Sequence, residues 1–397
     1  MNALTSQPLI LWRQVSGLAA VQGAITLSWM LYRIYLPQLL AGFGFVGWEQ
    51  GIQILEDLLA VAIEPIAGGL SDRQRQGMGT RFPLIVGGVI LASGLLILIP
   101  AIFIFGKPFE AGRWILPVML IAWALAMAIF RAPVVSLLGE YAIATKLPQA
   151  MSLLIFVGGL AGAFRPIASE FILSLGPAIT FAIGSFVLLG SVAVLRATNP
   201  DAQVAEMPAN LATQRVSLLS LGLIAGAGVG IAWGTRLMMG EILPKVLKTQ
   251  LPTANVKVLL TAIAIALAFA SVPAGSFASQ VGNQRAMLLG VGFTGLLLLA
   301  IVYSQGPVLV TVVVIGLIIS YSLVTVTGIP FALSLVPPHR GGLGIGVYFG
   351  GFSLGISLCG VVLGQLLGLS LVIAGLMAAV AFLIAGICIA WKFRGNL

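Results

Sequence analysis

Charge is scarce in this sequence. Only 8% of the 397 residues are Asp, Glu, Lys or Arg, while 59% are hydrophobic. A soluble domain carries roughly a quarter charged residues, so this composition excludes a soluble globular protein. The mean hydropathy of +1.12 makes nearly every stretch of about 20 residues apolar enough to remain in the hydrocarbon core of a bilayer. The sequence therefore predicts an all-α, multi-pass membrane protein.

Cysteine and histidine are rarer still, with two Cys residues and one His. Cys359 and Cys388 lie inside apolar runs and His339 lies in a short loop, so the sequence contains no spacing typical of metal ligands or paired thiols. It also contains no Walker phosphate-binding loop and no pair of catalytic carboxylates in a soluble segment. We therefore expect no enzyme activity, no metal ion and no cofactor.

Basic residues exceed acidic ones, which gives a net charge of +9. Lys and Arg stand singly at the edges of apolar segments, a pattern typical of loops that orient helices in a membrane and not of a nucleic-acid-binding surface. The expected surroundings are therefore a lipid bilayer, and nucleic acid is not an expected partner.

Cutting the sequence at charged residues, Pro and Gly separates two sets of six apolar segments, twelve in all. The longest polar segment, residues 196–215, lies between the two sets. We expect residues 1–196 and residues 216–397 to form two six-helix bundles, joined by a cytoplasmic linker at residues 197–215. The predicted spans lie near residues 14–38, 47–71, 82–105, 113–138, 149–174, 177–196, 216–244, 255–279, 286–304, 307–335, 342–367 and 369–391.

An even number of spans places both termini on one side of the membrane, and the basic residues identify that side. Eleven Lys and Arg residues fall on the side of the termini, against five on the other side. By the positive-inside rule, both termini are predicted to be cytoplasmic, in an inner or plasma membrane, and we expect a monomer. The eleven are Arg13, Arg73, Arg75, Arg81, Lys146, Arg196, Arg215, Arg285, Arg340, Lys392 and Arg394; the five are Lys107, Arg113, Lys245, Lys248 and Lys257.

Short motifs recur between the two halves. LPQLL at residues 36–40 returns as LPKVL at residues 243–247, and PIAGGLSD at residues 65–72 returns as PAGSFASQ at residues 273–280. With two parallel six-helix repeats and a cytoplasmic linker, the chain resembles the major facilitator superfamily over nearly its full length. The resemblance implies the major facilitator fold, with one solute site between the halves.

The loop after the second predicted helix carries part of that superfamily's signature. Gly68, Asp72 and Arg73 match the signature, Arg75 stands where a second Gly belongs, and Arg81 follows in altered order. A closer resemblance is to the glycoside-pentoside-hexuronide cation symporters and the related sucrose transporters.

The residues that carry this closer resemblance are Glu64, Pro65, Gly68 and Pro83, together with RAPVVSLLGE at residues 131–140. In the resembled symporters, the carboxylate that matches Glu64 belongs to the cation site, and an acidic sugar-binding residue often lies near the position of Arg131. The opposite charge at Arg131 departs from that pattern. It puts a neutral sugar and sodium in doubt, and it favours an anionic group or proton coupling.

Four of the charged residues inside predicted spans need an explanation: Asp57, Glu64, Arg131 and Arg165. Each costs about 2.5–3.5 kcal/mol to insert at a helix centre, so each needs a reason. Counting about 1.5 Å per residue from the cytoplasmic ends places Glu64 level with Arg131, and Asp57 level with Arg165. Glu56 is turned about 100° away from Asp57 around the same helix.

These levels predict two ion pairs, and two interpretations of them remain open. The pairs could be structural salt bridges that tie helices together. Alternatively, at least one pair opens to take up a proton, a cation or a charged substrate, because charges at this depth usually face a water-filled path. We regard Asp57, Glu64, Arg131 and Arg165 as candidate substrate or ion ligands.

Aromatic and basic side chains lie close together late in the first and seventh predicted spans. Trp29 and Tyr32 are candidates for stacking on a substrate, although aromatic belt residues are also common at that depth. Arg33 and Arg236 lie near the outer boundary by the same count, where we expect their side chains to extend to the interface.

The charged loop after the second span is the predicted cytoplasmic gate. Asp72 can cap the positive N-terminus of the eleventh helix near Gly341 and Gly342, while an Arg meets Glu140 at the foot of the fourth. Simple positive-inside anchoring is the alternative, and it explains the Arg residues but not a buried Glu64. The candidate gating residues are Gly68, Asp72, Arg73, Arg81 and Glu140.

Together these features predict a secondary active transporter that works by alternating access. Its partners would be a small sugar-like or anionic organic solute and a coupling proton or cation. The alternative is a non-transporting accessory, assembly or pigment-handling membrane protein built on the same fold. The charged stripe on the second helix favours transport.

Overall fold

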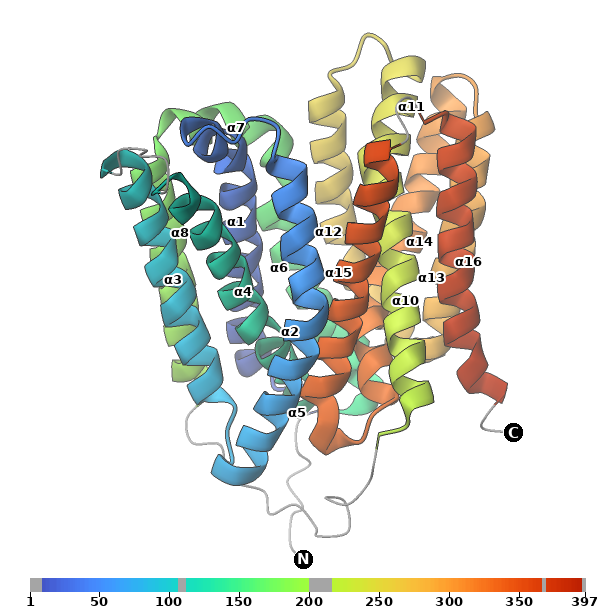
Figure 1. Ribbon diagram of the computed structural model, residues 1–397. Helices are drawn as coiled ribbons and strands as arrows, with labels where there is room; N and C mark the ends of the chain where they lie inside the picture. The colour runs from blue at the N-terminus through green and yellow to red at the C-terminus, as the bar shows by residue number, and fades with distance from the viewer. Residues whose placement is uncertain (1–8, 106–111, 200–215, 366–368, 395–397) are drawn as a thin grey trace, which may run out of the picture.

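The computed structural model describes residues 9–105, 112–199, 216–365 and 369–394, and almost all of them lie in helices (Figure 1). Within these ranges β pairing is limited to one isolated bridge, between Ile10 and Ala142. Most of the predicted linker, residues 200–215, lies outside the described residues, as do Lys107 and Arg215.

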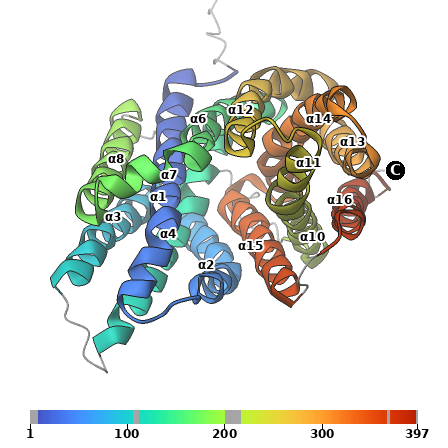
Figure 2. The same ribbon diagram turned by 90° about the horizontal axis from the view of Figure 1, so that it is seen from above.

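Helices of the N-terminal half occupy one side of the molecule and helices of the C-terminal half the other (Figure 2). The first half contains α1 (Trp12–Gly42), α2 (Glu49–Met78), α3 (Phe82–Phe105), α4 (Ile115–Ser136), α5 (Leu138–Tyr141), α6 (Leu147–Ala163), α7 (Arg165–Ser174) and α8 (Pro177–Thr198). The second contains α10 (Leu218–Leu237), the π-helical segment η3 (Met238–Ile242), α11 (Leu243–Gln250), α12 (Val256–Val281), α13 (Asn283–Tyr303), α14 (Pro307–Ser334), the short 3-10 helix η4 (Pro338–Arg340), α15 (Gly341–Gln365) and α16 (Leu371–Arg394).

Eleven helical segments of the described chain are long and apolar enough to cross a membrane. Helix α2 is also long enough, but it carries seven charged residues and is not among the eleven. Its 30 residues would extend about 45 Å, longer than the roughly 30 Å hydrocarbon core. The predicted all-α architecture, with helices long and apolar enough for repeated membrane crossings, is confirmed for the described residues.

Two predicted spans are not single straight helices. The span predicted at residues 149–174 breaks at Phe164 into α6 and α7, because Pro166 has no backbone N–H to continue the helix and instead occupies the first turn of α7. The seventh span widens at η3 and continues as α11, with Pro244 in the first turn of α11. Both interruptions lie toward the end of the molecule labelled α7 and α11 in Figure 1.

The terminal end is where α1 begins and α16 ends, and the opposite end is where α7 and α11 lie (Figure 1). The hydroxyl group of Tyr35 on α1 donates a hydrogen bond to the carbonyl of Ile172, 2.8 Å away, and so fixes α7 against α1.

The two halves meet mainly along two helix pairs, α2 with α15 and α6 with α12. Glycine permits both approaches. A Cβ atom at Gly275 on α12 would lie 2.7 Å from the Pro148 carbonyl oxygen of α6, and one at Gly346 on α15 would lie 2.3 Å from the Glu64 carbonyl oxygen of α2. Small residues at such crossings allow membrane helices to pack backbone to backbone.

Candidate functional site

Glu64 and Arg131 form an ion pair inside the molecule, as predicted from their depths. Glu64 on α2 is 1% exposed, and Arg131 on α4 donates from Nη2 to Glu64 Oε1. The guanidinium carbon of Arg131 lies 4.3 Å from the ring centroid of Phe349 on α15, within cation–π range. The pair therefore lies where the N-terminal half touches the C-terminal half.

One oxygen and one nitrogen of this pair remain without a partner. Glu64 Oε2 and Arg131 Nε are both buried and form no hydrogen bond in the part of the chain that the structure describes. A buried unsatisfied atom of a charged group is costly, so such atoms are candidates for binding water, a proton or a ligand.

The second predicted pair, Asp57 with Arg165, is wrong. Neither side chain forms an ion pair among the described residues. The depth of Arg165 was counted along one straight helix, but the chain breaks at Phe164, and Arg165 begins α7 with an exposed side chain. Asp57 is half-buried and lies within electrostatic range of Arg33, Arg131 and Arg236.

Glu56 is a charged residue of the site that the sequence analysis set aside. It is buried on α2, accepts a hydrogen bond from the Tyr32 hydroxyl group and lies 3.4 Å from Arg33 Nη2. The prediction that Arg33 extends to the membrane interface is therefore wrong, since its side chain is only 17% exposed. The sequence does carry a signal for Arg33 and Glu56, because both are charged residues that lie well inside apolar runs.

Aromatic rings form one wall beside these charges. Trp29 and Tyr32 of α1 pack against Trp123 of α4, with ring centroids 4.9 Å and 4.4 Å from the Trp123 ring. Arg33 lies 5.2 Å from the Trp29 centroid, which holds the guanidinium group over the aromatic face. Trp29 and Tyr32 are the two aromatic candidates from the sequence. Trp29 borders a small central cavity, whereas Tyr32 is buried and donates a hydrogen bond to Glu56.

A small cavity lies at the centre of this arrangement. It has a volume of about 30 Å³ and is lined by residues of α1, α2, α4 and α15. A volume of that size holds one or two water molecules and is far below the several hundred Å³ of a typical small-molecule site. Its lining residues are Trp29, Glu56, Asp57, Ala60, Glu64, Ala124, Met127, Ala128, Arg131 and Ser353.

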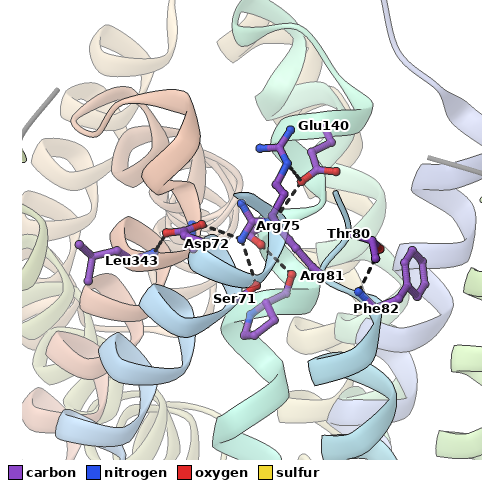
Figure 3. Close-up of polar contacts among 11 residues, drawn as sticks. Ser71, Asp72, Arg75, Thr80, Arg81, Phe82, Glu140 and Leu343 are labelled. Carbon is purple, nitrogen blue, oxygen red and sulfur yellow. Dashed lines mark hydrogen bonds and ion pairs between the residues drawn. The ribbon is translucent and has the colours of Figure 1, made fainter. Parts of the chain in front are cut away.

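Asp72 connects the two halves at the terminal end (Figure 3). Its carboxylate accepts hydrogen bonds from the backbone N–H groups of Gly342 and Leu343, at 2.9 and 2.8 Å. These are first-turn amides of α15, which have no partner within the helix and carry the positive end of its dipole. The predicted cap on the eleventh helix is confirmed.

Arg81 lies at the centre of the same network. It contacts Asp72 at 2.7 Å, Ser71 at 3.0 Å and Glu140 at 3.0 Å, while Arg75 reaches Glu140 at 3.1 Å (Figure 3). The predicted contact between an Arg and Glu140 is therefore confirmed. We call Ser71, Asp72, Arg75, Arg81 and Glu140, with the α15 N-terminus, the terminal gate. Arg73 is exposed and forms no ion pair within the described ranges.

Gly68 allows α2 to approach the terminal gate closely. A Cβ atom added there would lie 2.0 Å from the carbonyl oxygen of Gly342. No side chain fits in that space, so Gly at position 68 is a steric requirement of the contact between α2 and α15.

Contacts between the halves at the opposite end are weaker. Lys257 Nζ of α12 lies 3.6 Å from Glu170 Oε1 of α7, with side chains 61% and 88% exposed. Exposed ion pairs contribute little to stability. The Gln50 side chain of α2 also donates a hydrogen bond to the Gly360 carbonyl of α15 at 2.8 Å.

No protein-family model matches the chain, and no curated protein matches it. Solved structures of major facilitator transporters do match. The human organic anion transporter MFSD10 (TETRAN) has a TM-score of 0.70 at 12% identity, over 96% of this chain and 100% of its own. FucP in the outward conformation has a TM-score of 0.68 at 14% identity, over 95% and 98%.

The proton:xylose symporter XylE, solved with 6-bromo-6-deoxy-D-glucose, matches with a TM-score of 0.71 at 13% identity, over 97% of this chain and 96% of its own. Identities this low compare folds and not substrates. The chain therefore has the major facilitator fold over nearly its full length.

Proposed function

We propose that this chain is a secondary active transporter that moves a small organic solute, sugar-like or anionic, by alternating access with proton or cation coupling. The observation that carries the proposal is the pair of buried carboxylates of Glu56 and Glu64, gathered with the half-buried Arg131 around a cavity where the two halves meet. Buried charges in a membrane protein are costly and usually serve a transport path. The bundles 1–196 and 216–397 move against each other, joined by the linker 197–215.

Sidedness follows from the charge distribution of the loops. The terminal end faces the cytoplasm, and the protein acts as a monomer in an inner or plasma membrane. In this arrangement the terminal gate is the cytoplasmic gate. Its buried contacts close the cytoplasmic side, whereas the polar contacts between the halves toward the opposite end include the exposed Lys257–Glu170 pair and a hydrogen bond from Gln50 to the Gly360 carbonyl. The structure then corresponds to a state with the cytoplasmic side closed.

The central cavity must widen before a solute can bind, because its present volume of about 30 Å³ admits only water. Separation of the two halves at the opposite end supplies the space. Trp29 then offers a ring face to the solute, and Arg131 offers a charge once its bond to Glu64 opens.

Coupling rests on Glu64. The pair with Arg131 uses one carboxylate oxygen, and the second oxygen is buried with no partner among the described residues. In the glycoside-pentoside-hexuronide branch, which the chain resembles, the matching carboxylate belongs to the cation site. The fold that the chain shares with the proton:xylose symporter XylE and with an organic anion transporter is compatible with both proton coupling and an anionic solute.

Distance measurements across both ends test the proposal without knowledge of the solute. The native Cys359 and Cys388 are replaced by Ser, and spin labels are placed at Gln76 and Arg285 for the terminal end or at Val46 and Thr253 for the opposite end. Asp72→Asn weakens the terminal gate, so it should lengthen the first distance and shorten the second in lipid nanodiscs.

Arg73→Gln is the matched control, because Arg73 is an exposed neighbour outside the gate contacts. It should leave both distance distributions as in the parent protein. If Asp72→Asn leaves the distance distributions at both ends unchanged, alternating access is refuted. That result would favour the non-transporting accessory protein instead.

A further inference from the structure

A groove lies at the terminal end of the first half, between α3 and the last turn of α8, which pack side by side (Figure 1). Its volume of about 690 Å³ falls within the roughly 300–1,000 Å³ of typical ligand sites. This α3–α8 groove shares no lining residue with the central cavity. Its lining includes Thr80 in the turn before α3, Phe82, Val86 and Ile90 on α3, and Arg196 and Asn199 at the end of α8.

The wall that α3 contributes is apolar. Phe82, Val86 and Ile90 follow one another at four-residue spacing, so they share one face of the helix. From Phe82 to Ile90 the helix rises about 12 Å, close to half of the roughly 30 Å hydrocarbon core. Ile90 is 58% exposed, so the groove is open toward the lipid. An apolar chain lying on this wall would therefore fit within one leaflet of the bilayer.

The rim of the groove at the terminal end is polar and cationic. Arg196 is exposed in the last turn of α8 and forms no ion pair in the described ranges of the chain. Asn199 and the Thr80 hydroxyl group lie on the same rim, and both side chains can donate a hydrogen bond. A guanidinium group binds a phosphate through paired hydrogen bonds. Because the C-terminus of α8 disfavours an anion, binding of a phosphate here depends on the charge of Arg196.

The second half has an equivalent groove without such a rim. Helices α13 and α16 are the third and sixth long helices of their half, as α3 and α8 are of theirs. The groove between α13 and α16 has a volume of about 490 Å³, and the residues that line it are apolar side chains and Gly. An apolar chain suits both grooves, whereas a charged headgroup finds a partner in the α3–α8 groove.

We propose that the α3–α8 groove binds one anionic phospholipid, with its phosphate at Arg196 and an acyl chain along Phe82, Val86 and Ile90. The occupant must be amphipathic, because one wall is apolar and the rim is cationic. A soluble phosphate would leave the α3 wall uncovered, and a zwitterionic lipid carries a positive group that Arg196 repels. Anionic lipids are concentrated in the cytoplasmic leaflet, which is the side assigned to the terminal end.

Lipid binding is measured by native mass spectrometry on the full chain, purified in detergent and freed of bound lipid. The probes are phosphatidylglycerol and phosphatidylcholine with identical acyl chains, and glycerol 3-phosphate as a headgroup without chains. We expect the first phosphatidylglycerol to bind at least fivefold more tightly than phosphatidylcholine, and glycerol 3-phosphate not to bind at the same concentration. Arg196→Gln should reduce the preference below twofold. Arg285→Gln should retain it, because Arg285 is an exposed arginine at the terminal end of the other half.

A second variant tests the apolar wall by filling the groove. Gly87 on α3 lines the groove, and a Cβ atom there would meet nothing within 4 Å, so Gly87→Phe adds a ring without a clash at Cβ. It should weaken phosphatidylglycerol binding at least fivefold. Gly94→Phe is the matched control, since Gly94 is equally open on the same helix but outside the groove lining.

Equal affinity of the parent protein for the two lipids, a preference that Arg196→Gln retains, or binding that Gly87→Phe leaves intact would each overturn the inference. Binding of glycerol 3-phosphate as tight as that of phosphatidylglycerol would show that the groove accepts a soluble phosphate instead of a lipid. The inference does not depend on transport, because both walls of the groove belong to the first half. Asp72→Asn should therefore leave the lipid preference unchanged, whatever it does to the distances across the two ends.

Discussion

Asp72 Oδ1 and Arg81 Nη1 lie 2.7 Å apart, with side chains 0% and 1% exposed. This pair is embedded between the halves, since Asp72 also accepts two backbone hydrogen bonds from α15. A buried ion pair adds little net stability to a fold but becomes strongly destabilising when one partner is removed. The Asp72–Arg81 pair lies between the two bundles. It therefore suits a contact that forms when the bundles close and breaks when they separate, because both charges are then hydrated together.

Arg81→Gln should open the terminal end. Removal of one partner of a buried ion pair costs about 3–5 kcal/mol, and we expect the lower end of that range because Asp72 keeps its two bonds to α15. A cysteine introduced at Ser71, buried in the closed structure, should become accessible to a water-soluble maleimide. The control is Arg73→Gln, because Arg73 is an exposed arginine on α2, the helix that carries Ser71. It should leave Ser71→Cys protected, and equal labelling of Ser71→Cys in the Arg81→Gln and Arg73→Gln variants would contradict the gate assignment.

Gly68→Ala should separate α2 from α15. The added Cβ would lie 2.0 Å from the Gly342 carbonyl oxygen and 2.6 Å from its carbon, so the backbones must move apart. Ala at Gly69 provides the control, because its nearest neighbour would be Leu343 Cδ1 at 3.9 Å. Ala favours helix over Gly by roughly 0.5–1 kcal/mol, so Gly69→Ala should retain or raise the melting temperature while Gly68→Ala lowers it and opens the terminal end. A melting temperature equal in the two variants would show that the contact is not required.

Topology is predicted from eleven basic residues on the terminal side against five on the other. Single cysteines at Gln76 and Thr253, in the cysteine-free background, lie at the terminal and the opposite end and are both exposed. In intact cells, a membrane-impermeant maleimide should label Thr253→Cys directly and Gln76→Cys only after lysis. Labelling of both cysteines from outside would refute the predicted membrane topology. Labelling of Gln76→Cys but not of Thr253→Cys in intact cells would show that the chain has the opposite orientation in the membrane.

Local rules explain why much of the architecture could be predicted from sequence. Apolar runs have the length of a bilayer crossing, so most spans were placed within a few residues, and the third was predicted at the bounds that α3 has. Asp72 and Glu64 were identified because a helix N-terminus attracts a carboxylate and because a buried charge needs a partner. Depth counting succeeded for Glu64 and Arg131, since the count for Glu64 stays within α2 and the count for Arg131 crosses only the turn at Leu137 between α5 and α4.

The wrong predictions concern residues where the helix axis changes, or where contacts with a neighbouring helix set the direction of a side chain. Counting from residue 149 to Arg165 crosses the break at Phe164, and the predicted partner Asp57 is not where the count places it. Arg33 and Glu56 were each judged by their position along one helix. Their pairing depends on the rotation of α1 against α2, which a single sequence does not reveal.

Coupling is the last prediction, and it concerns Glu64. Its carboxylate is buried, bonds to Arg131 through one oxygen and has a second oxygen without a partner in the described structure. A proton on that second oxygen neutralises Glu64 and frees Arg131, while an anion at Arg131 frees Glu64 to take up the proton, so the two binding events favour each other.

Glu64→Gln imitates the protonated residue permanently. In proteoliposomes it should abolish accumulation driven by an inward proton gradient, and it should preserve exchange of labelled for unlabelled solute, because exchange requires no net proton movement. Glu49→Gln is the control, since Glu49 lies on the same helix but outside the cavity lining, and it should accumulate solute normally.

If Glu64→Gln accumulates solute as the parent protein does, Glu64 is a structural partner of Arg131 and the proton binds elsewhere. The next candidates are then Asp57 and Glu56, which line the same cavity. Glu170 is a poor candidate, because its side chain is 88% exposed and lies beside Lys257 at the opposite end.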